Sequence, residues 1–287
     1  MRSLDLMSLI LTLSILIPAT SRGQENPASA ATHIESPQEL VERLSPQQKQ
    51  QYDDANKAFN TQDYAGALTI YKLMLKDLPG DPVLSKFSSE AALNTGNTTL
   101  ALETIRPISQ TNPDDWQATG LLTRACAETG DKACRDSGIA HMLALRKRGL
   151  IPSHTQQYIV ERIATGGQTL FVYTSLEPWG HYQVYNYAQL FDEAGHLELR
   201  LTIESDDTDQ AFFAKQHPKE AAAGLRTFSL DGYQDSGLNA NKQRSETHYT
   251  FKFFIGQPDY ETVRDAFVNV ANGQTKPLSS RVNILSQ

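Results

Sequence analysis

A spacing of 34 residues recurs between residues 46 and 149 and limits the fold more than any other feature of the sequence. The prolines Pro79 and Pro113 are separated by this interval, and so are Gly96 and Gly130. Proline and glycine mark helix ends, because proline cannot continue a helix and glycine accepts the left-handed conformation that closes one. Apolar and small residues share the interval: Ala67 and Ala101, and Tyr71, Ile105 and Ile139. The period predicts stacked copies of one helix–turn–helix unit.

This pattern resembles the tetratricopeptide repeat (TPR), whose unit is a helix–turn–helix of the same length. The residues that carry the resemblance in the first unit are Ala55, Asp63, Tyr64, Ala67, Tyr71 and Pro79, and in the second Ser89, Gly96, Ala101, Ile105 and Pro113. The third unit keeps the turn at Gly130-Asp131 but has Arg135 where a small residue is expected, and it has no closing proline. The third unit is therefore a degenerate or capping repeat.

The boundaries of the helical region follow from its capping residues. Ser36 followed by Pro37, and Ser45 followed by Pro46, each predict the start of a helix, since serine caps and proline fits the first turn. We assign residues 36–149 to a TPR-like helical domain. Residues 24–35 are rich in Ala, Ser, Thr, Pro and Glu without an apolar period, which predicts a flexible spacer.

The first 23 residues predict a signal peptide. Arg2 precedes an uncharged apolar run from Leu6 to Ala19, which is shorter than the roughly 20 residues of a membrane-spanning helix. Ser21 and Gly23 supply the small residues that precede a cleavage site. Asp5 offsets the positive charge that Arg2 places before the apolar run, which leaves an uncleaved N-terminal membrane anchor as the alternative. We therefore expect a periplasmic or secreted protein.

After Gly149 the apolar pattern changes to a period of two, and residues 150–274 predict a β-rich domain. Between His196 and Ser205, Leu197, Leu199, Leu201 and Ile203 alternate with polar residues, and a hairpin through residues 193–195 predicts a preceding strand. Further strands are expected around Leu170–Tyr173, Phe228–Leu230 and Tyr249–Phe253. Asp259 predicts the cap of a last helix that Gly273 closes, and residues 275–287 form a tail. The fold class is α+β: a TPR-like α–α solenoid, then a mainly antiparallel sheet packed against a C-terminal helix.

The two cysteines, Cys126 and Cys134, lie four residues on either side of Gly130. If two antiparallel helices meet at this glycine, facing Cα atoms at equal height are roughly 4–5 Å apart, a separation that a disulfide accepts. An exported protein favours this bridge, and two buried thiols are the alternative. The spacing is not that of a Cys-x-x-Cys redox or metal motif.

The sequence contains no recognisable catalytic or metal-binding motif. Its 7 histidines are scattered, and no P-loop, Gly-x-Ser-x-Gly or dinucleotide-binding motif occurs. The acidic cluster at Glu204, Asp206, Asp207 and Asp209 lacks the glycine of a calcium loop, and we interpret it as a solvated turn. A net charge of −7 argues against nucleic-acid binding, and 39% hydrophobic residues argue against a polytopic membrane protein. We expect no cofactor and no metal.

The TPR resemblance implies that the first helices of the pairs line a concave face that holds a peptide. The residues expected on this face are Tyr52, Asn56, Phe59, Lys86, Glu90, Asn94, Arg124 and Glu128. The family's clamp for chaperone tails needs basic residues where this chain has Tyr52, Gln117 and Leu121, and only Asn56 of that clamp remains. That specificity is therefore not carried over. A groove that is solvated, or filled by the chain itself, is the alternative.

The leading hypothesis is an exported, non-enzymatic adaptor that binds a protein or peptide through the helical array, with the β-rich domain as a second contact. The first alternative is an enzyme whose site lies in the β-rich domain, where His181, His217 or His248 would meet a carboxylate in a cleft. The second is a purely structural component of the cell envelope. The residues after Gly149 resemble no family that we recognise.

Overall fold

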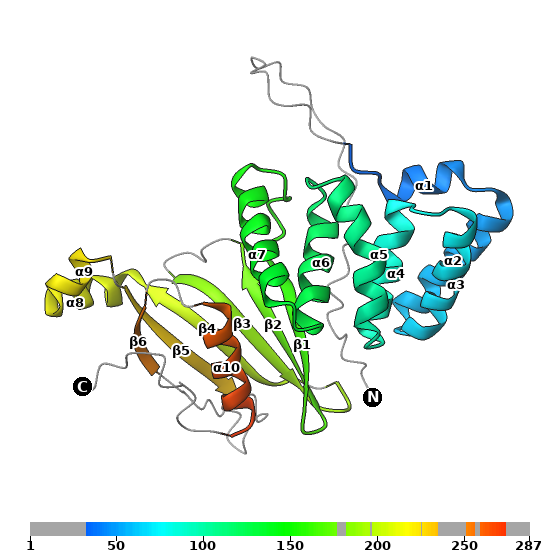
Figure 1. Ribbon diagram of the computed structural model, residues 1–287. Helices are drawn as coiled ribbons and strands as arrows, with labels where there is room; N and C mark the ends of the chain where they lie inside the picture. Colours follow the sequence, from blue (N-terminus) through cyan, green and yellow to red (C-terminus); the bar gives the residue numbers. More distant parts are fainter. Residues whose placement is uncertain are drawn as a thin grey trace, which may run out of the picture. The chain divides into compact units, whose positions relative to one another are not determined.

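The computed structural model describes residues 33–176, 182–195, 197–224, 226–234, 251–255 and 259–273. From Ile34 onward these residues belong to one compact unit that contains a helical array and an antiparallel sheet (Figure 1). The predicted signal peptide, residues 24–32 of the spacer and the tail at 275–287 lie outside the described residues. Among the helices in the described ranges, none combines the length and the apolar character that a membrane crossing requires.

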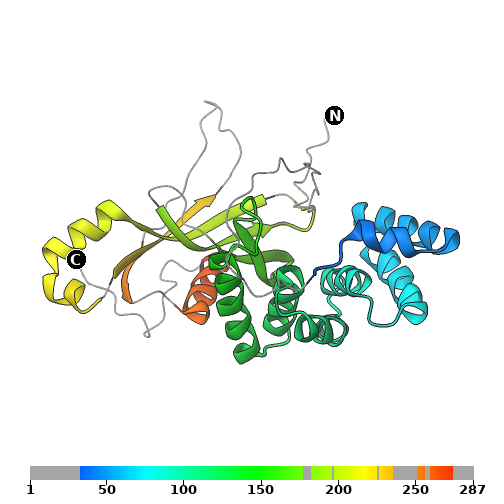
Figure 2. The same ribbon diagram turned by 90° about the horizontal axis from the view of Figure 1, so that it is seen from above.

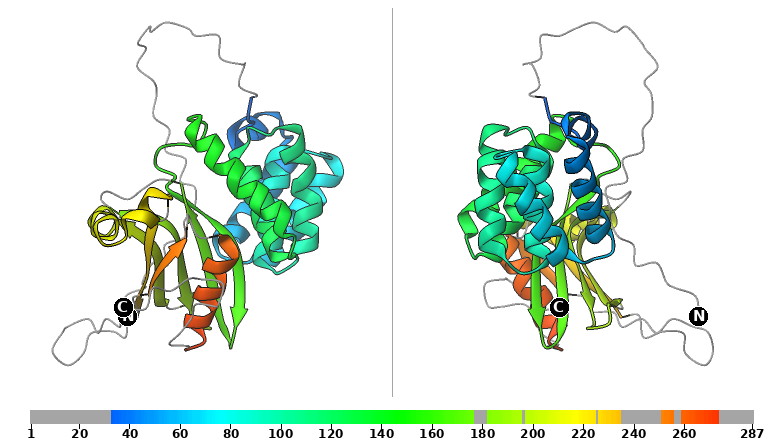
Figure 3. Two further views of the ribbon diagram at one scale, coloured as in Figure 1. Left: turned by 60° about the vertical axis from the view of Figure 1, so that its left-hand side comes forward. Right: turned by 90° about the vertical axis from the view of Figure 1, so that its right-hand side faces the viewer.

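The helical array consists of a short leading helix and three helix pairs that stack side by side (Figures 1 and 3). The leading helix is α1 (Pro37–Arg43). The pairs are α2 (Pro46–Asn60) with α3 (Tyr64–Asp77), α4 (Pro82–Asn94) with α5 (Thr98–Thr111), and α6 (Trp116–Glu128) with α7 (Lys132–Lys147). This order of paired helices confirms a TPR-like repeat region between residues 46 and 149.

The helix boundaries follow the capping residues of the sequence. Ser36 and Ser45 each form a capping box. The serine hydroxyl accepts the backbone N–H of the residue three positions on, and the Glu or Gln side chain of that residue accepts the backbone N–H of the serine. Gly96 and Gly130 lie at the corners within the second and third pairs with φ angles of 77° and 80°. A residue with a Cβ rarely adopts this conformation, so these glycines end their helices as predicted.

Small residues bring the helices of each pair together. Ala55 and Ala67 are fully buried in the first pair, and in the second the Ser89 hydroxyl donates to the Ala101 carbonyl at 3.1 Å. In the third pair the close approach occurs at Gly138, because an added Cβ there would lie 2.1 Å from Thr123 Oγ1. The third pair therefore keeps the packing principle of the repeat at a shifted position.

The sheet is a six-stranded antiparallel meander in which each strand pairs with the next along the chain. Its strands are β1 (Gln157–Thr165), β2 (Gln168–Ser175), β3 (Tyr182–Phe191), β4 (Leu197–Asp206), β5 (Arg226–Gln234) and β6 (Phe251–Ile255). The β3–β4 hairpin confirms the predicted turn before Gly195, and Leu199, Leu201 and Ile203 are buried as predicted. Strand β1 was not foreseen, and Tyr249 lies outside the described residues.

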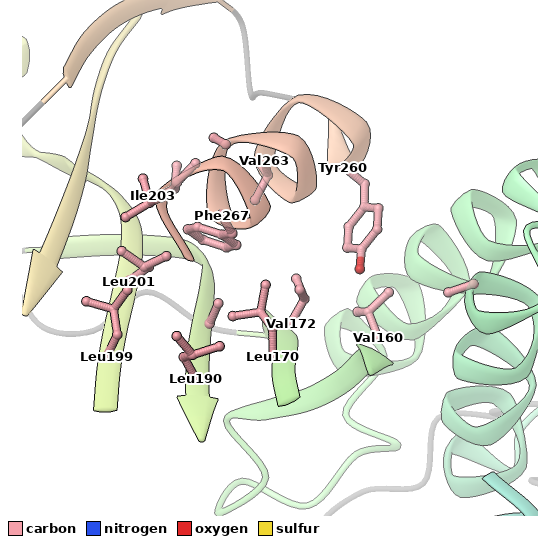
Figure 4. Packing of buried hydrophobic residues seen from close by; sticks show 14 residues of the cluster. Val160, Leu170, Val172, Leu190, Leu199, Leu201, Ile203, Tyr260, Val263 and Phe267 are labelled. Carbon is pink, nitrogen blue, oxygen red and sulfur yellow. The ribbon is translucent and has the colours of Figure 1, made fainter. Parts of the chain in front are cut away.

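The helix α10 (Tyr260–Ala271) covers one face of the sheet and completes its core (Figure 4). Phe267 and Val263 are fully buried against Leu170 and Val172 of β2 and Leu201 of β4. Asp259 caps α10 by accepting the backbone N–H of Thr262 at 2.7 Å. The prediction of an antiparallel sheet packed against a C-terminal helix is confirmed.

The end of the array belongs to the same hydrophobic cluster as the sheet. Ala127 of α6 is buried in this cluster, and Ile139 of α7 packs against it. Arg135, the residue that departs from the repeat pattern, is 3% exposed and lies over the Tyr260 ring at 4.4 Å. It also donates to Glu261 at 2.5 Å. The third repeat diverges at Arg135 because this position contacts α10 instead of another helix pair.

The acidic cluster does not form the predicted turn. Glu204 and Asp206 belong to the end of β4, and α8 (Asp207–Gln216) begins at once with Asp207 and includes Asp209. A second short helix, α9 (Pro218–Ala222), follows before β5, and Figure 2 shows both helices beyond the ends of the strands. The sequence misleads here because the four acidic residues sit at the junction of two regular elements.

Candidate protein-binding surface

The eight residues predicted for the groove lie on the first helices of the pairs, and we call this set the inner face. Its members are Tyr52, Asn56 and Phe59 on α2, Lys86, Glu90 and Asn94 on α4, and Arg124 and Glu128 on α6. Residues four apart share one side of a helix, so the three α4 residues form a stripe. Helices α4 and α6 contact each other directly, so the inner-face residues of these two helices adjoin.

Lys86 at the start of the α4 stripe is an internal ion-pair partner. Lys86 is 9% exposed, and its Nζ donates to Asp115 Oδ2 at 2.9 Å and to Gln117 Oε1 at 3.2 Å. Asp115 also caps α6 by accepting the N–H of Ala118 at 3.0 Å. Lys86 therefore joins α4 to the start of α6, and its charge is compensated within the protein.

Arg124 at the other end of the inner face is also engaged within the chain. Its Nε donates to Glu128 Oε1 at 2.7 Å, and its Nη2 donates to Asn94 Oδ1 at 3.2 Å. Strand β1 closes this end, because the backbone N–H of Arg162 donates to Glu128 at 3.0 Å and its Nη1 donates to the Asn94 carbonyl at 3.3 Å. The chain itself thus occupies the C-terminal end of the inner face.

Glu90 lies between these two networks and differs from its neighbours. It is half-buried, yet it forms no hydrogen bond and no salt bridge with any residue in the part of the chain that the structure describes. Burial raises the pKa of Glu90, and the nearby charge of Arg124 lowers it in part. Burial likewise raises the pKa of Glu128, although that carboxylate is paired with Arg124. Glu90 is the inner-face carboxylate without a direct partner among the described residues.

The α2 part of the inner face is largely aromatic and apolar. Tyr52 is 4% exposed and belongs to a cluster with Leu40 and Leu44, so it packs in the core beneath α1. Asn56 accepts a hydrogen bond from the Tyr71 hydroxyl at 2.6 Å. Phe59 is half-buried, with its ring edge-on to Tyr64 at 5.2 Å between ring centres. Phe59 is therefore the aromatic side chain that α2 presents at the surface.

Three residues that the sequence did not assign to the site lie around Glu90 and Arg124. Tyr64 is close enough to Glu90 for that carboxylate to contribute to its raised pKa, after burial as the main cause. Arg162 of β1 contacts Asn94, and burial raises the pKa of Tyr173 of β2 to about 12, with Arg124 opposing the shift. The sequence predicts a strand at Tyr173 but not the strand that holds Arg162, and it gives no indication that either residue meets the helices.

The two cysteines form the predicted disulfide. Cys126 and Cys134 are joined, with 5.7 Å between their Cα atoms, and the bond ties α6 to α7 next to the corner at Gly130. The neighbouring carboxylate of Asp131 caps α7 by accepting the N–H of Cys134 at 3.1 Å. The acidic group beside the disulfide therefore has a structural role at the helix start.

Little of the alternative enzymatic site can be located in the described residues. His181 and His248 lie outside them, and His217 stacks on the Phe213 ring at 5.3 Å between α8 and α9. Catalysis by the β-rich part stays an untested hypothesis.

Comparisons with known proteins find similarity to solved structures but to no protein family. No protein-family model matches the chain, and no match emerges from a search of curated proteins. Among solved structures, the TPR domain of Sgt2 from Aspergillus fumigatus is similar at 19% identity over 37% of this chain and 76% of that chain, with a TM-score of 0.33. A chain of the CopN–Scc3 complex is similar at 11% identity over 41% of this chain and 69% of that chain, with a TM-score of 0.33.

Proposed function

We propose that this protein is a non-enzymatic adaptor that binds a protein or peptide at the partly exposed portion of its inner face. The supporting observation is the stacking of the helix pairs, which brings Phe59 of α2 and Glu90 of α4 to the inner face while each keeps part of its surface exposed. Aromatic and charged side chains on rigid helices suit the recognition of an extended peptide.

The sheet supports this role by holding the array and by adding residues beside the inner face. Arg162 and Tyr173 come from β1 and β2, and the contacts of Arg135 with Tyr260 and Glu261 fix α7 against α10. A surface built from both regions keeps its shape without a ligand, which lowers the entropy cost of binding. The sheet is thus the second contact region of the adaptor.

Site-specific photocrosslinking in cells tests the location of the binding surface. A photoreactive phenylalanine analogue replaces Phe59 on α2 in one variant and Leu73 on α3 in the control, where the native side chain is 47% exposed. We expect discrete adducts with another protein from position 59 and none from position 73. Equal adduct formation from both positions, or none from position 59, contradicts the proposal.

We further propose that the protein is exported after cleavage of residues 1–23, so that it acts in the periplasm or outside the cell. The apolar run from Leu6 to Ala19 and the disulfide between Cys126 and Cys134 support this, because disulfides persist in oxidising compartments. N-terminal sequencing of the protein from fractionated cells should find Gln24 as the first residue. An intact N-terminus in the membrane fraction indicates the anchored alternative, and an intact cytosolic protein contradicts export.

A further inference from the structure

Glu90 is the inner-face charge that is not balanced by direct contact with any residue that the structure describes. The lysine one turn before it is paired with Asp115 at 2.9 Å, and Asn94 one turn after it binds Arg124 at 3.2 Å. Arg124 in turn pairs with Glu128 at 2.7 Å. Among the described residues, the cation that acts on Glu90 is Arg124, at longer range and without a salt bridge. The stripe on α4 therefore offers a carboxylate between two residues whose polar groups are already used.

The other charged groups around Glu90 are held by their own partners. Arg162 Nη1 donates to the Asn94 carbonyl at 3.3 Å, and the Arg162 backbone N–H donates to Glu128 at 3.0 Å. Because electrostatic energy falls with distance, these arginines compensate Glu90 less than a cation in direct contact would. A partly desolvated carboxylate gains most from a charge-assisted hydrogen bond that a ligand supplies.

Two aromatic residues that contact each other lie near this carboxylate. Phe59 and Tyr64 contact each other edge-on, with 5.2 Å between ring centres, and the charge of Glu90 contributes to the raised pKa of Tyr64. Ring faces and a carboxylate together favour an ammonium or guanidinium group, through cation–π attraction and ion pairing. Charge complementarity thus selects a cationic side chain in preference to an acidic one.

We infer that the inner face recognises an extended peptide segment with a lysine or arginine, whose cationic group binds Glu90 beside Phe59 and Tyr64. This inference rests on the proposed peptide-binding function and specifies the chemistry of the partner. The peptide lies on the part of the inner face formed by α2 and α4, because β1 already occupies the end at Asn94 and Glu128. A segment with an acidic residue at this position is rejected, because it would place two carboxylates together.

A selection from a phage-displayed library of random peptides tests both levels of this inference. The full-length mature protein is the bait, and Glu90→Gln and the exposed control Glu103→Gln are selected in parallel. We expect the wild type and the control to enrich peptides with a basic residue at one fixed position, and Glu90→Gln to lose that preference. If the wild type enriches no peptide, the proposed function fails. If it enriches peptides without this preference, the function stands and the inference about Glu90 is wrong.

Affinity measurements on one selected peptide complete the test. Fluorescence anisotropy compares the peptide with its lysine against the same peptide with norleucine, on the wild type and on Glu90→Gln. We expect each single change to weaken binding about tenfold, and the second change to add little once the first is made, as for two groups in contact. Independent, additive losses would show that the lysine binds elsewhere. Circular dichroism of Glu90→Gln verifies that the fold is retained.

Discussion

The helical array and the sheet region differ in the sequence distance over which their parts are held together. In the array, polar contacts between helices join residues close in sequence: Tyr71 and Asn56 are 15 apart, and Lys86 and Asp115 are 29 apart. In the sheet region, the contact of Tyr260 with Glu161 spans 99 residues. The array is thus specified within each repeat and between neighbouring repeats, whereas the sheet core is completed only when the last helix docks.

The largest expected effect comes from removing the centre of the long-range core. Phe267 is fully buried between α10 and the sheet, and truncation of such a ring costs about 4 kcal/mol through lost burial and the cavity left behind. We expect Phe267→Ala to lower the free energy of unfolding in urea by this amount. Because Ala127 of α6 shares the cluster, the array should unfold in the same transition. Leu73→Ala, at an exposed position, serves as the control.

Two separate transitions in the Phe267→Ala variant would show that the array is stable alone. Hydrogen exchange of the array amides distinguishes the outcomes, since amides that open only by global unfolding lose protection together with those of the sheet.

The second effect concerns the covalent link within the third repeat. Cys126 and Cys134 are 8 residues apart, and closing so short a loop stabilises the folded state by about 2–3 kcal/mol in the chain-entropy account. We expect reductant to lower the Tm of the wild type and to leave the Tm of a Cys126→Ala, Cys134→Ala double variant unchanged. A wild-type Tm that is insensitive to complete reduction contradicts the stabilising role.

A third prediction compares two basic residues that both contact Glu261. Arg135 is 3% exposed and also lies over the Tyr260 ring, so Arg135→Ala should destabilise the protein by about 2 kcal/mol. The side chain of Lys132 is 64% exposed, and Lys132→Ala should cost no more than about 0.5 kcal/mol. Denaturation in urea measures both. Equal losses would mean that the contact of α7 with α10 depends on charge alone.

The smallest effect is a pH dependence at the boundary between the two regions. Burial raises the pKa of Glu90 above its ordinary 4.5, so the folded protein binds this proton at a higher pH than the unfolded chain does. Stability then falls as the pH rises through the interval between the two pKa values. The Tm of the wild type minus that of Glu90→Gln should therefore increase as the pH is lowered from about 8 towards 4.5. A difference that is constant with pH, as expected for the Glu103→Gln control, contradicts this assignment.

Most of the array could be predicted from the sequence because its determinants are local. The serine–proline starts at Ser36 and Ser45, the glycines at the corners and the small residues between helices act within one or two turns of the chain. Even Cys126 and Cys134 could be paired, since their distance follows from the geometry of one helical corner. The candidate site was predicted only in part: its residues were identified, but Tyr52, Lys86 and Arg124 are buried and engaged within the chain.

The repeat period, the helix ends, the β3–β4 hairpin and the amphipathic last helix can be read from local patterns, since each depends on residues that are neighbours along the chain. Three features became visible only in the folded chain: Arg135 meets α10, Arg162 closes the end of the inner face, and Glu90 has no direct partner among the described residues. The physical reason is that burial and charge pairing depend on which surfaces meet across the chain. No local pattern encodes those distances.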